Sequence, residues 1–194
     1  VAHPAMSPVG DFLYFVSDMP GGYGGLDLWR INVVQDGFGY VDNLGPEINT
    51  AGDEMFPTFG PKGELYFSSN GHPGMGGLDI FRAVQDTLSG KWKVENMRSP
   101  LNSASDDFGM TFEPGHPRGF FSSNRGDARG WDHIYSFELP EVNHVLTGWV
   151  YDKEGDPLPD ALVTIVGDDG TYLKINVKKD GSFVQQLTPG QRYV

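Results

Sequence analysis

Three aspartates stand at matching places in the chain and are its best-placed candidates for binding chemistry. Each follows a glycine-rich segment and precedes an apolar stretch; they are Asp27, Asp79 and Asp132, with Gly25, Gly77 and Gly130 two residues before them. These carboxylates could bind a cation or a glycan, or each could accept backbone N–H bonds from its own glycine-rich loop and hold the turn. Because a ligand site normally breaks the symmetry of a repeat, the recurrence favours the structural role.

Other residue types that carry chemistry lack the spacing that the chemistry needs. The glycine clusters at 21–25 and 74–77 are not followed by Lys-(Ser/Thr), so they do not predict a phosphate-binding loop. The chain has no cysteine, no Gly-x-Ser-x-Gly elbow and no i,i+4 pair among its histidines, which are His3, His72, His116, His133 and His144. We therefore predict no catalytic residues, no metal and no cofactor, in a protein that is not an enzyme.

Acidic pairs and aromatic residues in predicted loops are weaker candidates. The pairs Asp53-Glu54, Asp106-Asp107 and Asp168-Asp169 could be glycosidase carboxylates or calcium ligands. The first two pairs are equivalent in the repeat, which favours a solvated loop. Weak calcium binding stays open for Asp156, Asp168, Asp169 and Asp180, without the spacing of a calcium loop. Tyr23, Phe38, Tyr40 and Trp92 could form an interaction surface, or could equally pack over hairpins.

A repeat of about fifty residues organises most of the chain. Pro8, Pro61 and Pro114 are 53 residues apart each time, and each begins a turn between an extended segment and an apolar segment. We predict three units of strands, at about 3–50, 54–103 and 107–141, with four strands in the period and the outer strand missing from the third. We also expect a longer parent protein, with further units before Val1.

The pattern changes from His144 onward. Alternating apolar segments at 145–152, 161–166, 172–177 and 183–187 are separated by turn sequences, including Asp168-Asp169-Gly170. These segments predict a short-strand meander that forms a small, incomplete β-sandwich over 144–194. No segment predicts a helix. The fold class is therefore all-β, with a domain at 1–141 and a second at 144–194.

Composition narrows the function classes. A net charge of −12 excludes nucleic-acid binding as the expected role, because phosphates need lysine and arginine partners. No apolar run reaches the 18 or so residues that cross a bilayer as a helix, so we predict no direct membrane span.

These segments resemble two known families. The units from His3 to Asp18 and their copies, with the loop Gly-Gly-Leu-Asp-(Leu/Ile)-(Trp/Phe), resemble TolB-type, WD-like β-propeller repeats. The segments Thr147–Asp152, Gly155–Val163 and Asp180–Phe183 are similar to the carboxypeptidase-regulatory-like family, which is a transthyretin-like β-sandwich. The resemblance implies three four-stranded-type blades of a larger propeller ring, followed by a truncated sandwich.

The order of the two families resembles OmpA-family envelope lipoproteins, in particular those of the type IX secretion system. This resemblance implies a non-enzymatic interaction scaffold in the periplasm of a Gram-negative bacterium, associated with the outer membrane. The implied partners are other envelope or secretion-system proteins, with peptidoglycan bound through a domain outside this chain. A glycan- or peptidoglycan-binding propeller without a secretion role is the alternative.

Overall fold

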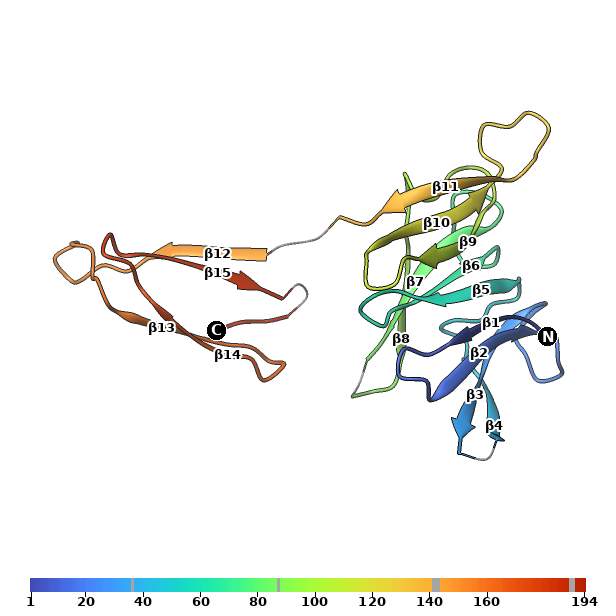
Figure 1. The fold of residues 1–194 in the computed structure, drawn as a ribbon, viewed down its shortest axis with the longest axis horizontal. Coiled ribbons are helices and arrows are strands. Elements are labelled where there is room, and N and C mark those ends of the chain that lie inside the picture. Colours follow the sequence, from blue (N-terminus) through green and yellow to red (C-terminus); the bar gives the residue numbers. More distant parts are fainter. Residues whose placement is uncertain (36, 87, 141–143, 189–190) are drawn as a thin grey trace. The chain divides into compact units, whose positions relative to one another are not determined.

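A computed structural model of the chain describes residues 1–35, 37–86, 88–140, 144–188 and 191–194. The secondary-structure elements among these residues are all β-strands, and every strand pair is antiparallel. The predicted all-β class is therefore confirmed. The chain divides into two compact units, Val1–Leu139 and Pro140–Val194, here called the N-terminal and C-terminal units (Figure 1). The predicted domain end at 141 lies outside the described residues.

The N-terminal unit contains three sheets, one for each repeat (Figure 1). Repeat 1 has the strands β1 (Ala2–Met6), β2 (Phe12–Ser17), β3 (Asp27–Val34) and β4 (Gly37–Asn43). Repeat 2 has β5 (Glu54–Phe59), β6 (Leu65–Ser69), β7 (Asp79–Gln85) and β8 (Trp92–Asn96). Repeat 3 has β9 (Asp107–Phe112), β10 (Arg118–Ser123) and β11 (His133–Glu138). Within each sheet the strands pair in chain order, and the third sheet has three described strands, as its shorter sequence predicts.

The sheets pack face to face, and β6 shows why its sequence is apolar throughout. All five of its residues are buried. Leu65 and Phe67 belong to the core shared with repeat 1, whose members include Tyr14 and Leu28. Tyr66, on the opposite face, belongs to the core shared with repeat 3. A strand covered on both faces needs apolar residues at successive positions, because successive side chains point to opposite faces.

The first strand of each repeat carries an irregularity at the same place. His3, Phe56 and Gly109 have φ values of 49°, 54° and 65°, and they are 53 residues apart. The pairing of β1 with β2, β5 with β6 and β9 with β10 shifts register close to these positions. Such bulges bend a strand locally. The strand β5 contacts both β1 and β9, so the three bent strands lie next to one another.

The C-terminal unit has two sheets of two strands. The strand β12 (His144–Trp149) pairs with β15 (Ser182–Leu187), and β13 (Leu162–Val166) pairs with β14 (Tyr172–Asn176). The predicted meander is therefore wrong, because β12 pairs with the last strand and not with the next one. The chain after β12 folds back on itself through a bridge between Tyr151 and Pro157, which separates β12 from β13.

Candidate functional site

Asp27 and Asp79 hold the glycine-rich loops that precede them. Asp27 is buried at the start of β3 and accepts hydrogen bonds from the backbone N–H groups of Tyr23 at 2.5 Å and Gly24 at 3.2 Å. Asp79, buried at the start of β7, accepts from the N–H groups of Met75 at 2.7 Å and Gly76 at 2.9 Å. Each carboxylate therefore provides hydrogen-bond acceptors for backbone N–H groups of its loop and fixes the loop's conformation.

Gly25 and Gly77 lie where the connector to the next repeat passes close to the loop. A Cβ atom on Gly25 would stand 2.3 Å from Oδ1 of Asp53, and one on Gly77 would stand 2.2 Å from Oδ1 of Asp106. These glycines are required for close approach of the connector, since real Cβ atoms do not come so near.

Asp132 does not share this arrangement. Ser17 pairs with Asp27 and Ser69 pairs with Asp79, but the equivalent Ser123 pairs with His133. The three loops have the same length, since each of these pairs is ten residues apart, but Asp132 stands one residue before the paired position, so it falls just outside β11 and is exposed. Gly130 has a φ of 73° and no atom within 4 Å of a Cβ position, so it allows the turn without a close approach.

A different aspartate, Asp127, organises the loop of repeat 3. Its carboxylate accepts hydrogen bonds from Arg129 Nη2 at 3.0 Å and from the Arg129 backbone N–H at 2.8 Å, and His133 Nε2 lies 2.8 Å from it. The bonds from Arg129 and then His133 hold the pKa of Asp127 well below its ordinary value. The guanidinium of Arg129 also lies 4.0 Å from the ring of Trp131, which is exposed.

This group of three side chains beside Trp131 was not predicted from the sequence. The signal was present, because this loop is the one that departs from the Gly-Gly-Leu-Asp pattern of the other two repeats. The group is thus specific to repeat 3 and breaks the repeat symmetry.

The connectors between repeats contain buried asparagines that sequence reasoning also missed. The amide of Asn49 accepts from the Leu28 N–H at 2.8 Å and donates to the Leu28 carbonyl at 2.9 Å. Asn102 makes the same two bonds with Ile80, at 2.9 and 2.8 Å. Each amide thus continues the hydrogen bonding of a strand into the next connector. Both asparagines stand at equivalent positions in connectors rich in turn-forming residues. Such a sequence is typical of a solvated loop, so it gave no sign that the two side chains are buried.

Glu54 and Asp107 correct the expectation of solvated acidic pairs, because both side chains are fully buried. Glu54 accepts hydrogen bonds from Thr50 N–H at 2.8 Å, Thr50 Oγ1 at 2.7 Å and Ser69 Oγ at 2.7 Å. Asp107 accepts from Ser103 and forms an ion pair with Arg125. A buried carboxylate is stable only with such partners, so these residues fasten each connector to the repeat that follows it.

The four aromatic residues expected at an interaction surface do not form one cluster. Phe38 and Tyr40 lie two residues apart on β4 and are 63% and 89% exposed. Tyr23 is exposed in the glycine-rich loop of repeat 1. Trp92 is half-buried and lines a cavity between repeats 1 and 2, together with Tyr14. Two surfaces and one cavity therefore take the place of a single patch.

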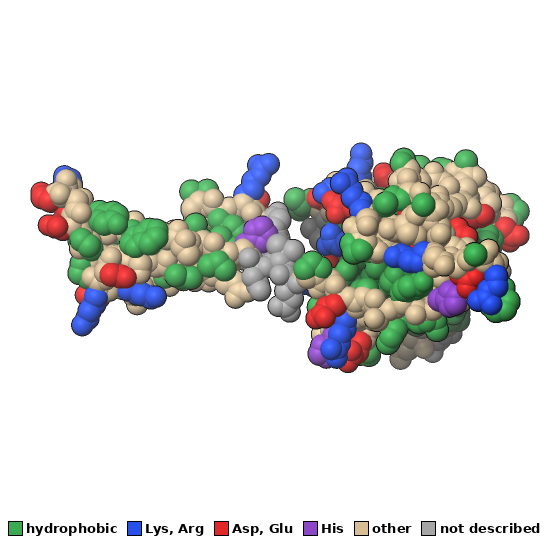
Figure 2. All heavy atoms as spheres, turned by 90° about the horizontal axis from the view of Figure 1, so that it is seen from above, with side chains coloured by type: hydrophobic (Ala, Val, Ile, Leu, Met, Phe, Trp, Pro, Cys, Tyr) green, Lys and Arg blue, Asp and Glu red, His purple; other side chains and the backbone are tan. Residues whose placement is uncertain are grey.

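Hydrophobic side chains reach the surface of both units (Figure 2). In the C-terminal unit, Val145, Trp149 and Val184 are exposed on the paired strands β12 and β15. Among the described residues, no group of three or more His, Asp or Glu side chains is placed to hold a metal ion. The described part of the chain also contains no helix that is long and apolar enough to cross a membrane.

Comparison with known proteins does not assign the chain to a family: no protein-family model matches it, and no curated protein matches it.

Proposed function

We propose that the N-terminal unit is part of a β-propeller and that the C-terminal unit is a transthyretin-like sandwich. Face-to-face packing of meandering antiparallel sheets supports the first assignment. The two pairs of strands in the C-terminal unit, with Ile165 and Val177 buried, support the second.

One face of the sheet of repeat 3 is uncovered, and this supports the proposal that the N-terminal unit belongs to a larger propeller ring. Phe120 and Ile134 are 57% and 78% exposed, whereas the equivalent Tyr66 and Ile80 of repeat 2 are buried against repeat 3. Apolar residues at these positions are explained if another unit of the same kind covers them. We propose that a further repeat of the parent protein does so.

The proposed function is that of a non-enzymatic scaffold for protein–protein interaction. By resemblance, it works in the periplasm as part of an OmpA-family envelope lipoprotein that links secretion machinery to the outer membrane and peptidoglycan. The order of the two families is similar to that in PorE, a lipoprotein of the type IX secretion system. The partners are other envelope or secretion-system proteins, and peptidoglycan is reached through a domain outside this chain.

One observation carries the scaffold proposal: the outer strand of repeat 1 presents two exposed aromatic side chains, whereas the one aromatic residue of the equivalent strand, Trp92, is half-buried. Phe38 and Tyr40 are exposed on β4, which is the edge strand of its sheet. Register with β3 and β7 places Lys93 of β8 at the position of Tyr40. An exposed aromatic edge that is specific to one repeat fits a protein partner, because aromatic residues are enriched in interfaces and edge strands can accept a pairing strand.

In-cell photo-cross-linking of the full-length parent protein tests this proposal. A photoreactive amino acid at position 38 or 40 should give defined protein adducts. The same amino acid at Val9, an exposed residue in the first turn, should not. Adducts to envelope or secretion-system proteins would support the scaffold. Equal labelling from all three positions, or no protein adduct, would contradict it.

Glycan binding is a second candidate because of the group around Trp131. Its indole ring is exposed for stacking on a sugar, and Arg129 and Asp127 place charged hydrogen-bonding groups beside it. Titration with soluble peptidoglycan fragments would distinguish the two functions. Binding that is lost in Trp131→Ala and kept in Tyr40→Ser would favour the glycan module, whereas absence of binding would exclude it.

A further inference from the structure

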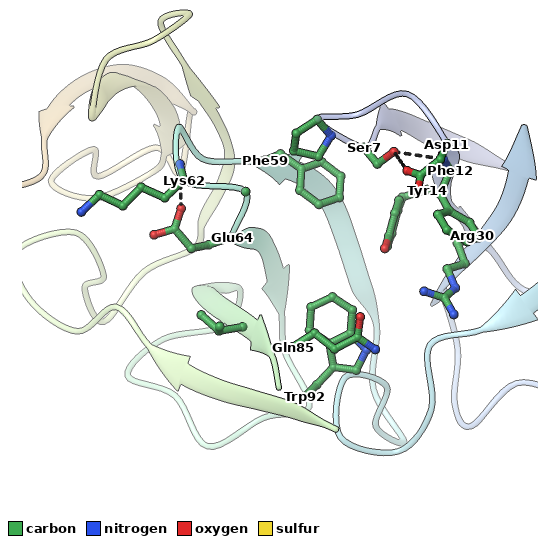
Figure 3. A pocket seen from close by; sticks show the side chains of 13 residues that line it. Ser7, Asp11, Phe12, Tyr14, Arg30, Phe59, Lys62, Glu64, Gln85 and Trp92 are labelled. Carbon is green, nitrogen blue, oxygen red and sulfur yellow. Dashed lines mark hydrogen bonds between the residues drawn. The ribbon is translucent and has the colours of Figure 1, made fainter. Parts of the chain in front are cut away.

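A cavity of about 360 Å³ lies between repeats 1 and 2 (Figure 3). Four aromatic rings line it together with several polar side chains; the rings are those of Phe12, Tyr14, Phe59 and Trp92. Small-molecule sites combine an apolar lining of this kind with a few polar groups that fix the ligand's orientation. The cavity therefore has the size and composition of a ligand site.

The polar side chain that distinguishes this cavity is Arg30. Its Nε atom is buried, and no residue in the described part of the chain accepts a hydrogen bond from it. The same holds for its terminal nitrogens among the described residues. The nearest carboxylate oxygen, Oδ2 of Asp42, is 3.8 Å from Nε, which is beyond hydrogen-bonding distance. Buried donors are nearly always paired, so Nε requires a partner, whereas the terminal nitrogens, on a side chain that is 26% exposed, are open to solvent or to a ligand.

Comparison with repeat 2 shows which partner is missing. Arg30 and Arg82 are equivalent, because each pairs with the tyrosine of the preceding strand. Arg82 donates to Glu64 at 3.1 Å, and Glu64 stands two residues before its tyrosine. The residue at that position in repeat 1 is Phe12. Arg30 therefore lies 4.6 Å from an aromatic ring, where its counterpart binds a carboxylate.

The apolar packing next to the cavity also differs between the two interfaces. Between repeats 2 and 3, the ring of Phe137 packs 5.2 Å from the ring of Phe112. Strand register places Ala83 of repeat 2 at the position of Phe137, and Phe59 at the position of Phe112. The cross-strand partner changes in the opposite sense, since Leu65 stands opposite Ala83 and Gly119 opposite Phe137, so the two interfaces are filled by different side chains.

The carboxylates in the wall are already engaged. Glu64 accepts hydrogen bonds from Arg82 and from the backbone N–H of Lys62, whose side chain extends away from the cavity (Figure 3). Asp11 accepts a 2.6 Å hydrogen bond from Ser7 Oγ. In contrast, the hydroxyl of Tyr14 has no hydrogen-bond partner among the described residues. Arg30 and Tyr14 thus supply the unpaired donors.

We propose that this cavity binds a small organic carboxylate with a flat apolar ring. The carboxylate takes the place that Glu64 has beside Arg82 and accepts charge-assisted hydrogen bonds from Arg30. The Tyr14 hydroxyl donates a further hydrogen bond, and the ring lies among Phe59, Trp92 and the Tyr14 ring. This site is independent of the scaffold role.

A matched pair of probes tests the carboxylate requirement. Indole-3-acetate carries the carboxylate on a flat ring, and indole-3-acetamide is its neutral counterpart. Isothermal titration of the 194-residue chain at low salt should show about tenfold or more tighter binding of the acetate, because a charged carboxylate accepts stronger hydrogen bonds from Arg30 than a neutral amide oxygen does. Equal affinities for the two probes, or no binding of the acetate at millimolar concentration, would overturn the proposal.

Two variants test the residues. Arg30→Gln should reduce the affinity for indole-3-acetate to that for the acetamide, whereas Arg118→Gln, an exposed arginine outside the cavity, should leave it unchanged. Phe12→Glu restores the carboxylate of repeat 2 beside Arg30 and should abolish acetate binding without loss of thermal stability. Acetate binding that survives Phe12→Glu in a folded protein would refute the role of Arg30, even if Arg30→Gln failed to fold.

Discussion

The buried amide of Asn49 should contribute more to stability than its number of hydrogen bonds suggests. Replacement by alanine removes its bonds to Leu28 N–H and C=O and to Asn43 Oδ1, at 2.8, 2.9 and 2.8 Å. The Leu28 N–H is then buried without a partner, which costs about 1–3 kcal/mol. With the loss of the remaining bonds, we expect Asn49→Ala to lower the free energy of unfolding by about 2–4 kcal/mol.

An exposed asparagine provides the matched control. Asn70 also bonds a connector, accepting from Asp53 N–H at 2.7 Å and donating to the Asp53 carboxylate at 3.2 Å, but both bonds are open to solvent. Water replaces them after Asn70→Ala, so the expected cost is below about 1 kcal/mol.

Urea unfolding followed by tryptophan fluorescence measures both variants. In a background with Trp131→Phe and Trp149→Phe, the remaining tryptophans, Trp29 and Trp92, both report on the N-terminal unit. The transition midpoint should shift clearly for Asn49→Ala and little for Asn70→Ala, at constant slope. Equal shifts for the two variants would refute the argument that burial decides the cost.

Three further predictions follow from buried or paired ionisable groups. Glu54→Gln should destabilise the N-terminal unit by about 1–3 kcal/mol, because an amide NH₂ would face donors that now bond a carboxylate; the exposed Glu154→Gln, measured by the same urea unfolding, should have almost no effect. Burial raises the pKa of Tyr66 to about 12, so the unfolded chain releases this proton first and stability should fall as pH rises from about 10 to 12. Tyr66→Phe should remove that part of the decline in pH-dependent urea unfolding, and an unchanged slope would contradict it. The pKa of Asp127 lies below its ordinary value, so its contribution to stability is present above about pH 4 and is lost as pH falls through the lowered pKa. Carboxyl ¹³C NMR titration should show this pKa rising toward its ordinary value in Arg129→Gln, and no rise would contradict the assignment to Arg129.

Much of the strand pattern could be predicted from sequence because it depends on local signals. The strand β2, for example, coincides with an apolar run that a Pro-x-Gly turn precedes. The missing outer strand of repeat 3 is likewise visible in its shorter sequence. The partner of β12 was not predictable in this way, because pairing with β15 joins segments more than thirty residues apart.

The site residues depended more on packing between repeats. Asn49 and Glu54 are polar residues in a connector, and their sequence context does not reveal that two repeats close over them. Asp132 follows a glycine at nearly the repeat spacing, yet it stands one residue before the position that pairs with Ser123, which His133 occupies, so it lies outside the strand. Arg30 lacks a carboxylate partner because Phe12 stands where repeat 2 has Glu64, and this difference becomes meaningful only once the register of the strands is known.

Loss of partner binding after substitution of the β4 edge tests the scaffold proposal most directly. Phe38 and Tyr40 are exposed, so the double variant Phe38→Ser/Tyr40→Ser should fold normally. Quantitative affinity purification of the full-length parent protein from cells would compare it with the control Val9→Ser. The proposal predicts that specific envelope or secretion-system proteins are lost from the double variant and retained by the control. An unchanged set of co-purifying proteins would contradict it.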